Sequence, residues 1–425
     1  MKKLILLFLT AISTVAYSQD TIRVMHYNLM YYYRTSTYCT AANNPTATKD
    51  NCLKKIAKYI NPDIFTANEV NPVTATHQHV LDDILNTDGV THYKRGNMSN
   101  NAGSDLSNAM FYNSDKLVLK SQQNIYTSVR DINIYNFYYK AWNIATTDTA
   151  YLTCIVIHLK AGNTISDSTT RITQSNTLMN YLNSINKKAN YLLMGDFNIR
   201  TADEQCFQNF INHSNVNIRF YDPINMIGDW YNNYSYSSIH TQSTHTSSDG
   251  CFATGGMDDR YDFILQSEFI KNGTDHIHYI NGSYQAIGND GNHRNDAINY
   301  GTNNSAPSDV IDALYDMSDH LPVVMNLLVD QTTVGISETQ AGNTEVSLTN
   351  PVTDILRFSL SPAPDSHLEI SISNLLGQTV YYHKQTTDGN NPTFEIPVQF
   401  LTKGFYLLRI ADGANRPVVR KFIKN

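Results

Sequence analysis

The segment Ser318-Asp319-His320-Leu321-Pro322-Val323-Val324-Met325 places an acid and an imidazole directly before an apolar run. The run has the length and composition of a buried β-strand. A carboxylate can hold a divalent cation, and a neutral imidazole can take a proton from water. Asp-His pairs also occur in ordinary loops, so this segment predicts a catalytic site only together with similar polar clusters elsewhere.

Such clusters adjoin five other short apolar runs. Asn28 follows residues 22–27, Asn68 and Glu69 follow 64–67, His158 follows 152–157, Asp196 and Asn198 follow 191–195, and Asp262 precedes 263–265. Polar residues at the ends of several buried strands predict convergence on one edge of a sheet. The spacing of two between Asp196 and Asn198 predicts that an extended chain presents both side chains to the same side.

Six short segments at these strand ends form a set that is more specific than any one of them. They are His26-Tyr27-Asn28, Asn68-Glu69, His158-Leu159-Lys160, Gly195-Asp196-Phe197-Asn198, Arg260-Tyr261-Asp262-Phe263-Ile264-Leu265 and Ser318-Asp319-His320-Leu321-Pro322. In this order, over roughly residues 20 to 330, the set resembles the endonuclease/exonuclease/phosphatase superfamily of deoxyribonuclease I-like phosphodiesterases. The resemblance implies an α+β fold, a four-layer α/β/β/α sandwich of two face-to-face sheets with helices outside. It also implies metal-assisted attack of water on a phosphate ester.

Phosphodiester hydrolysis requires a site that neutralises the phosphate, activates water and protonates the leaving group. We assign His320 as the base and Asp262 as the group that fixes its tautomer. His158 is the acid or a donor to the phosphate oxygens. Asp196 and Asn198 position the water and a phosphate oxygen. Glu69 is the first metal ligand, Asn28 orients it or binds a metal-bound water, and Asp319 binds a second ion or supports Asn198. Hard oxygen ligands predict Mg²⁺ or Mn²⁺.

One departure from the family concerns His158. Family members often support this histidine with a carboxylate from a strand that corresponds to residues 108–112 here. That stretch contains Asn108 but no acid. The acid role of His158 therefore lacks its usual support.

Three further features bear on ligands. Tyr32 and Arg34 follow Asn28, and Lys160 follows His158, so they are candidates for stacking on bases or gripping phosphates. The loop 288–293 is a candidate structural Ca²⁺ site, although it lacks the spaced acids of an EF-hand.

The charge pattern guides the choice of substrate. The net charge of −7 offers no global attraction to nucleic acid, so any phosphate binding must be local. Dispersed cations argue against a polyphosphate-specific phosphatase, and only residues 134–139 suggest a membrane-wedging hairpin, for which a sandwich strand is the alternative. We therefore expect a nuclease acting on extracellular DNA ahead of RNA, without stable membrane insertion. A sphingomyelinase-like or other phosphoesterase and a catalytically inactive surface-binding protein are the alternatives.

The chain of 425 residues predicts two folded units. Residues 1–18 read as a signal peptide, with Lys2-Lys3 before a short apolar core, and 331–345 read as a linker. Residues 19–330 are the expected catalytic domain. From 346 to 425, short alternating strands predict a small β-sandwich.

The C-terminal sandwich also resembles a known sorting domain. The matching segments are Asn350-Pro351, Asn374-Leu375-Leu376-Gly377-Gln378, Gly404-Phe405-Tyr406 and Lys421-Phe422-Ile423-Lys424. They resemble the C-terminal sorting domain of the type IX secretion system. The resemblance implies contact with the secretion machinery, passage through an outer membrane and a secreted or cell-surface location, usually with removal of the tail.

The five cysteines are compatible with disulfides in an exported chain. Cys39 and Cys52 flank a polar loop and are the favoured pair, and Cys206 with Cys251 is a second candidate. Cys154 lies in an apolar run and is expected to be a buried free thiol.

Local patterns also predict two helices and a loop. Apolar spacing indicates helices over 50–59, with Asp50 as the cap, and over 170–184. The polar stretch 225–250 reads as a long surface loop.

Overall fold

The structure is a computed structural model that describes residues 19–141, 149–248, 250–330, 345–361, 367–374, 378–386, 393–411 and 418–425. These residues fall into two compact units, one within Met1–Thr333 and one within Val334–Asn425. The predicted leader, 1–18, lies outside the described residues. So does the predicted linker, except for Glu345, which begins a strand.

Two β-sheets form the centre of the first unit. The first has the order β11-β13-β1-β2-β4-β3, and β12 pairs with β13 at its side; the second has the order β5-β6-β7-β8-β10-β9. The strands of the first sheet are β1 (Gln19–Tyr32), β2 (Ile64–Val70), β3 (Tyr93–Arg95), β4 (Ser107–Asn113), β11 (Ile277–Tyr279), β12 (Gln285–Ala286) and β13 (Val323–Asp330). Those of the second are β5 (Leu117–Ile125), β6 (Ile132–Tyr139), β7 (Tyr151–His158), β8 (Tyr191–Asp196), β9 (Phe220–Tyr221) and β10 (Asp262–Ser267).

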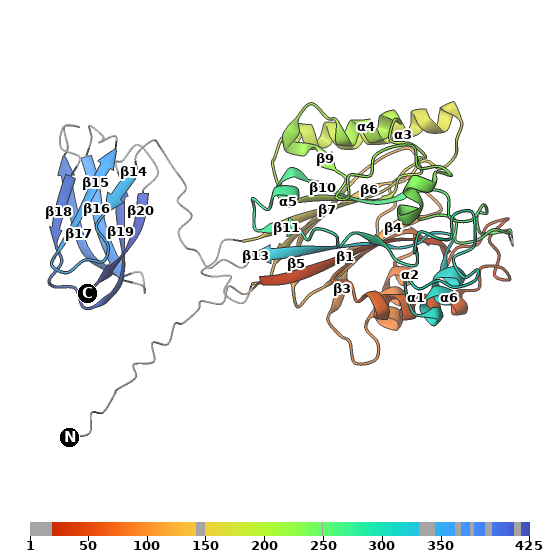
Figure 1. Cartoon of the computed structure of the whole chain (residues 1–425), viewed down its shortest axis with the longest axis horizontal. Coiled ribbons are helices and arrows are strands. Elements are labelled where there is room, and N and C mark those ends of the chain that lie inside the picture. The colour runs from red at the N-terminus through yellow and green to blue at the C-terminus, as the bar shows by residue number, and fades with distance from the viewer. Residues whose placement is uncertain are drawn as a thin grey trace, which may run out of the picture. The chain divides into compact units, whose positions relative to one another are not determined.

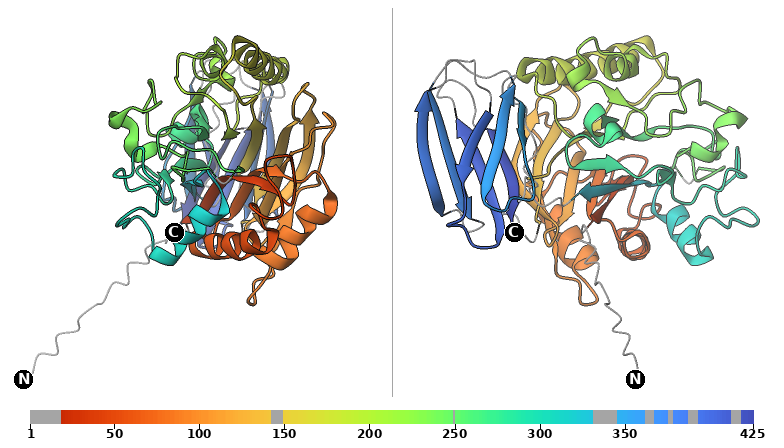
Figure 2. Two further views of the ribbon diagram at one scale, coloured as in Figure 1. Left: turned by 90° about the vertical axis from the view of Figure 1, so that its right-hand side faces the viewer. Right: turned by 60° about the vertical axis from the view of Figure 1, so that its left-hand side comes forward.

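Helices cover the outer faces of both sheets, as Figures 1 and 2 show. On the side of the first sheet lie α1 (Thr46–Ile60), α2 (Thr74–His79), the π-helical η1 (Val80–Leu85) and α6 (Ser308–Met317); on the side of the second lie α3 (Ile165–Ile185) and α4 (Gln205–Ile211). The remaining short helices are η2 (Val216–Ile218), η3 (Tyr234–Ile239) and α5 (Glu268–Asn272). The predicted four-layer sandwich is therefore confirmed.

Three apolar layers hold the sandwich together. Val24, Ile64, Met194 and Ile264 belong to the layer between the two sheets. A second layer packs α1 and α6 against the first sheet, and a third packs α3 and α4 against the second. Strands β8 and β10 are buried along their whole length because both faces of their sheet are covered.

Strand pairing explains why the polar clusters converge. The parallel pair β1–β2 aligns Asn28 with Asn68, and the parallel pair β7–β8 aligns His158 with Asp196. The antiparallel strand β10 begins at Asp262, which pairs with Asp196. Strand β13 runs antiparallel to β1, so His320, just before it, arrives at the same end.

Two helices begin earlier than the sequence predicted. Helix α1 begins at Thr46, after Pro45, and Asp50 is not its cap. Instead, Asp50 accepts hydrogen bonds from the hydroxyl groups of Tyr32 and Tyr33. Helix α3 begins at Ile165 because Thr164 forms a capping box with its third residue, a local signal that the apolar spacing did not reveal.

The predicted surface loop over 225–250 is only partly on the surface. It contains η3, and His240, Thr241 and Thr244 are buried. The stretch packs against the segment before β13, since Leu321 N donates to Thr241 O and Thr244 N donates to Asp319 O. The burial could not be predicted from the polar composition of this stretch, because the buried polar groups are satisfied by hydrogen bonds and not by apolar packing.

The second unit consists of two facing sheets around one apolar core. The sheets have the orders β14-β15-β18 and β17-β16-β19-β20. Their strands are β14 (Glu345–Leu348), β15 (Ile355–Ser361), β16 (His367–Asn374), β17 (Thr379–Thr386), β18 (Thr393–Pro397), β19 (Gly404–Ala411) and β20 (Val418–Lys424). The predicted C-terminal β-sandwich is confirmed.

Candidate active site

A histidine–aspartate pair lies at the sheet edge where the strands converge. His320 Nδ1 donates to Asp262 Oδ2 at 2.7 Å, which leaves Nε2 of the ring facing the site. Asn28 Nδ2 lies 3.5 Å and Asp196 Oδ2 lies 3.8 Å from that Nε2 atom. Burial lowers the pKa of His320, but the carboxylates of Asp262, Asp196 and Asp319 outweigh it and raise the pKa well above its ordinary value. This pair can hold a proton at Nε2 and return it.

Two carboxylates and a second histidine form a compact cluster beside the pair. Ligand atoms of Glu69, His158 and Asp196 all lie within 4.8 Å of one another. Asn28 Nδ2 donates to Glu69 Oε1 at 3.2 Å and to Asp196 Oδ2 at 3.0 Å, so one amide orients both carboxylates. Burial raises the pKa of Asp196 to about 7; His320 opposes this rise, and Asp262 and Glu69 add to it. Such a cluster of mutually repelling carboxylates is suited to a cation.

His158 differs from His320 in its surroundings. Its Nε2 atom lies 3.6 Å from Asp196 Oδ2 and 3.8 Å from Glu69 Oε1, and its buried Nδ1 atom has no hydrogen-bond partner among the described residues. Burial, Arg130 and His320 lower its pKa well below the ordinary value. The imidazole is therefore neutral, which suits a ligand or a hydrogen-bond donor better than a general acid.

Asn108, which lies where the resemblance implied an acid, takes part in a buried network of amides. Asn68 Oδ1 accepts from Asp196 N, Asn68 Nδ2 donates to Asn108 Oδ1, and Asn108 Nδ2 donates to Asn133 Oδ1, each at 2.8 Å. Asn68 and Asn108 belong to the first sheet, whereas Asp196 and Asn133 belong to the second. These hydrogen-bonded amides therefore connect the two sheets next to Glu69 and Asp196, and they set the position of one sheet relative to the other.

An uncommon backbone conformation sets the direction of the Glu69 and Asn198 side chains. Glu69 (φ 61°) and Asn198 (φ 52°) both adopt the left-handed conformation, which is uncommon outside glycine and often found at functional sites. The predicted extended spacing of Asp196 and Asn198 is therefore wrong. Asn198 instead turns back, so that its N–H donates to Asp196 Oδ1 at 2.9 Å and its amide donates to Leu159 O. Gly195 precedes this turn at a point where a Cβ atom would lie 2.0 Å from Ile157 O, which only glycine avoids.

Two residues at the site were missed from the sequence. Gln242 Nε2 lies 2.7 Å from His320 Nε2 and 3.3 Å from Asp319 Oδ2. Arg130 donates to Leu159 O, and its charge acts on Glu69, Asp196 and His158. Both residues lie in loops whose sequences show no motif, so their place at the site follows only from the folded arrangement of the chain.

The predicted substrate-binding residues fit their roles unequally. Tyr32 is fully buried, with its hydroxyl group on Asp50, so its assignment as a stacking residue is wrong. Arg34 is half-exposed and pairs with Asp105, and Lys160 pairs with Asp167 at 2.9 Å. Both cations are at the surface, and each already has a carboxylate partner.

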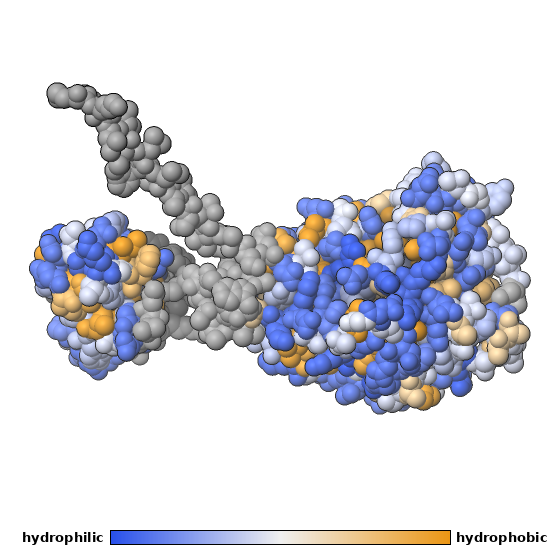
Figure 3. Space-filling view, turned by 90° about the horizontal axis from the view of Figure 1, so that it is seen from below, coloured by the Kyte–Doolittle hydropathy of each residue, from blue (hydrophilic) through white to orange (hydrophobic). Residues whose placement is uncertain are grey.

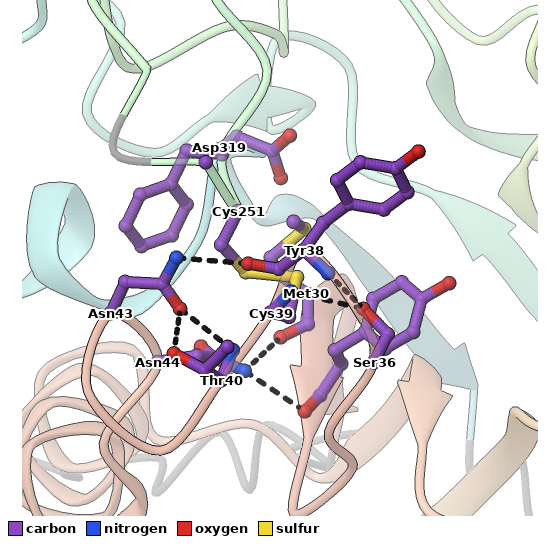
Figure 4. The surroundings of a disulfide bond; sticks show 12 residues. Met30, Ser36, Tyr38, Cys39, Thr40, Asn43, Asn44, Cys251 and Asp319 are labelled. Carbon is purple, nitrogen blue, oxygen red and sulfur yellow. Dashed lines mark hydrogen bonds between the residues drawn. A yellow bond between two sulfur atoms is a disulfide. The ribbon is translucent and has the colours of Figure 1, made fainter.

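Asp319 is not brought to the metal cluster. Its Oδ2 atom accepts from Ala253 N at 2.9 Å and from Gln242, and the side chain of Asn198 bonds elsewhere. The prediction that Asp319 supports Asn198 is therefore wrong, whereas binding of a second ion stays a prediction, since Asp319 Oδ1 is buried without a hydrogen-bond partner among the described residues. The carboxylate instead anchors the loop that carries Gln242, next to a disulfide (Figure 4).

That disulfide joins Cys39 to Cys251 across 212 residues. Both predicted pairs, Cys39–Cys52 and Cys206–Cys251, are wrong, because Cys52 and Cys206 are buried in helices α1 and α4 against apolar cores. The prediction that Cys154 is a buried free thiol is confirmed. The bond links the loop after β1 to the loop that contains Ala253, and the end of β1 contacts the site, since Tyr31 N donates to Glu69 Oε2.

We expect the double substitution Cys39→Ser/Cys251→Ser to lower the free energy of unfolding by about 2–5 kcal/mol, because the bond closes a long loop in the unfolded chain. Urea unfolding of the oxidised protein measures this difference. Reductant should destabilise the wild-type protein and leave the double variant unchanged. Equal stability of wild type and variant would contradict this prediction.

The candidate calcium loop is held by its own side chains. Asp290 Oδ1 accepts from His293 Nδ1 at 2.8 Å and from Asn292 N at 2.9 Å. His293 is itself buried and also bonds to Tyr300 O. These bonds occupy one of the two carboxylate oxygens of Asp290. Among the described residues, the cluster of three His, Cys, Asp or Glu side chains that could hold an ion lies at Glu69, His158 and Asp196, so the structure gives no support to Ca²⁺ at this loop.

Comparison with known proteins identifies the C-terminal unit. Residues 349–425 match the family described as the secretion system C-terminal sorting domain. The predicted sorting domain is therefore confirmed, and it indicates export and a secreted or cell-surface location through the secretion machinery. In the described part of the chain, no helix is long and apolar enough to span a bilayer. Comparison with curated proteins finds no match.

Several solved structures resemble the chain at low sequence identity. An endonuclease/exonuclease/phosphatase family protein from Bacteroides thetaiotaomicron is 14% identical, covers 74% of this chain and 97% of its own, and gives a TM-score of 0.44. The human Nocturnin catalytic domain is 16% identical, covers 73% of this chain and 97% of its own, and gives a TM-score of 0.44. A mannosyl-6-phosphatase from B. thetaiotaomicron is 15% identical, covers 72% of this chain and 99% of its own, and gives a TM-score of 0.43. No activity follows from similarities at this level.

Proposed function

We propose that residues 19–330 form a divalent-metal-dependent phosphoric ester hydrolase, and within that class a secreted endonuclease that acts on extracellular DNA ahead of RNA. The observation that carries the proposal is the cluster of Glu69, His158 and Asp196 within 4.8 Å, directly beside the Asp262–His320 pair. A cation site, a base with a fixed tautomer and several amide donors are together what phosphodiester hydrolysis requires.

The residues present fit a hard divalent cation. The buried carboxylate of Asp196 lies close to the partly buried carboxylate of Glu69. The pKa of Asp196 is raised to about 7 by burial and by its charged neighbours, as expected where a compensating cation belongs. Glu69 and Asp196 would hold Mg²⁺ or Mn²⁺, with the neutral His158 next to them. Asn28 would orient these carboxylates and not ligate directly, because its oxygen accepts from Met30 N. The bound metal would supply positive charge to the anionic phosphate oxygens.

The remaining residues would act on the water and the phosphate. His320 Nε2 takes a proton from the attacking water, and Asp262 keeps the other ring proton on Nδ1 and stabilises the charged ring. His158, Asn198 and Arg130 donate hydrogen bonds or positive charge to the phosphate oxygens. Asn28 and Gln242 hold the His320 ring in place from the site side.

The surface favours a soluble polyanion over a lipid. Residues 134–139, the candidate for a membrane-wedging hairpin, belong to strand β6, which is mostly buried between β5 and β7. On the face that Figure 3 shows, hydrophilic residues predominate over the larger unit and hydrophobic residues occur in scattered patches. A lipid-cleaving enzyme would be expected to expose a larger contiguous apolar surface.

An activity panel tests the proposal. We expect the purified protein with Mg²⁺ to nick supercoiled plasmid, with weaker action on RNA, and to lose nicking in the His320→Ala variant. Nicking should weaken as the salt concentration rises, because phosphate contacts release counterions. Sphingomyelin and soluble phosphomonoesters are assayed with the same preparation. Lipid turnover without His320-dependent nicking would overturn the nuclease assignment and leave the hydrolase class standing.

A further inference from the structure

A cavity of about 580 Å³ opens beside the candidate reaction centre. Three of its lining residues adjoin the catalytic groups. Asn198 N donates to Asp196 Oδ1, Gln242 lies 2.7 Å from His320 Nε2, and Tyr261 precedes Asp262 in the chain. A volume in the range of roughly 300–1,000 Å³ accommodates a ligand of nucleotide size. A substrate bound at the reaction centre would therefore extend into this cavity.

Arg200 supplies the cavity with an available cationic donor. Its Nε atom donates to Tyr261 Oη at 3.1 Å and lies 3.7 Å from Asp259 Oδ2, and its guanidinium carbon lies 4.2 Å from the centre of the Tyr231 ring. These contacts fix the plane of the guanidinium group. Its two terminal nitrogens donate no hydrogen bond to the described residues.

The other cation of the cavity is already satisfied. Arg171 is buried, pairs with Glu204 at 2.7 Å, and donates to Lys160 O and Gly162 O. Glu204, the partner of Arg171, also lines the cavity, so that this pair is neutral as a whole. The rest of the lining consists largely of amides and hydroxyl groups, including those of Asn163, Thr164 and Ser168. The cavity thus offers one fork of cationic donors within a neutral polar wall, which matches one anionic group attached to a sugar.

We propose that this cavity is a subsite for a second phosphate group, one nucleotide unit away from the scissile phosphate, and that Arg200 binds that phosphate through its terminal nitrogens. The inference rests on the proposed function and narrows its substrate class. It predicts preference for esters that carry a neighbouring phosphate, as every internal position of a nucleic acid does, over esters of neutral alcohols.

Matched chromogenic nucleotides test the preference. Thymidine 5′-(p-nitrophenyl phosphate) is compared with its 3′-phosphorylated form, and thymidine 3′-(p-nitrophenyl phosphate) with its 5′-phosphorylated form. In at least one polarity, we expect the second phosphate to raise kcat/KM at least about tenfold, through KM more than kcat. Arg200→Gln should bring this ratio close to one, and Arg200→Lys should retain part of it.

A matched control and a binding measurement separate this inference from the proposed function. Arg219→Gln changes an arginine in a separate cavity and should leave the ratio unchanged. Calorimetry on the His320→Ala variant should show that thymidine 3′,5′-bisphosphate binds more tightly than either monophosphate, and that adding Arg200→Gln removes the difference. Equal ratios and equal affinities with and without Arg200 would overturn the subsite, even if the enzyme is active. Selective binding without hydrolysis would instead count against the proposed function alone.

Discussion

Replacing His320 by alanine is expected to reduce turnover of a phosphodiester by at least about a hundredfold, the scale for loss of a positioned base. His320 Nδ1 is bound to Asp262 at 2.7 Å, so the ring, when Nε2 carries no proton, presents its lone pair toward the site. In the described part of the chain, the other histidine of the cluster, His158, lacks a carboxylate at Nδ1. It is therefore a poor substitute for the missing base.

Two further variants test the same arrangement. Asp262→Asn preserves the shape of the pair, but an amide that donates to Nδ1 leaves the ring proton on Nε2, where the base is needed; a loss of similar size is expected. Asp196→Ala removes a carboxylate of the cluster and should also cost at least about a hundredfold. His278→Ala on β11 is the matched control. Rates close to wild type in His320→Ala, with circular dichroism unchanged, would remove His320 from the mechanism.

The parts of the site that could be predicted are those at strand ends. Asn28, Glu69, His158, Asp196 and Asp262 each adjoin a short apolar run, and a run that is buried on both faces is readable from composition alone. Because parallel and antiparallel pairing brings these ends to one edge, local patterns were enough to gather the cluster. The four-layer fold followed from the same runs together with the family resemblance.

The parts that could not be predicted depend on loops and on contacts distant in sequence. Cys39 and Cys251 are 212 residues apart, and nothing near either one indicates the other. Gln242 lies in a polar stretch that reads as solvent-exposed, and it reaches His320 only because that stretch packs against the segment before β13. Tyrosine is common at binding sites, but an irregularity of β1 between Asn28 and Tyr32 precedes this residue, whose hydroxyl group binds Asp50 in the interior.

Chelation is expected to abolish activity, and Glu69→Gln to weaken metal binding by more than roughly a hundredfold, beyond the 10–100-fold typical of residues that only support a ligand. Glu69 is placed for this role by its left-handed backbone and by two hydrogen bonds, from Asn28 Nδ2 at 3.2 Å and from Tyr31 N at 3.1 Å. These bonds orient the carboxylate toward Asp196. The neutral amide keeps the size of the side chain but lacks the charge that a hard cation requires.

Two readouts distinguish loss of the metal from loss of the fold. Activity removed by EDTA should return with Mg²⁺ or Mn²⁺. Calorimetric titration of the metal-free protein with Mn²⁺ should give a binding isotherm in wild type that Glu69→Gln lacks, and Mn²⁺ should raise the unfolding temperature of the wild type only. Glu268→Gln, an acidic residue at the start of α5 that pairs with Lys188, is the matched control and should behave as wild type. Full activity in metal-stripped buffer would contradict the metal-dependent mechanism. Unchanged Mn²⁺ affinity in Glu69→Gln would move the metal away from this carboxylate, since a carboxylate that ligates a hard cation cannot be replaced by an amide without a loss of affinity.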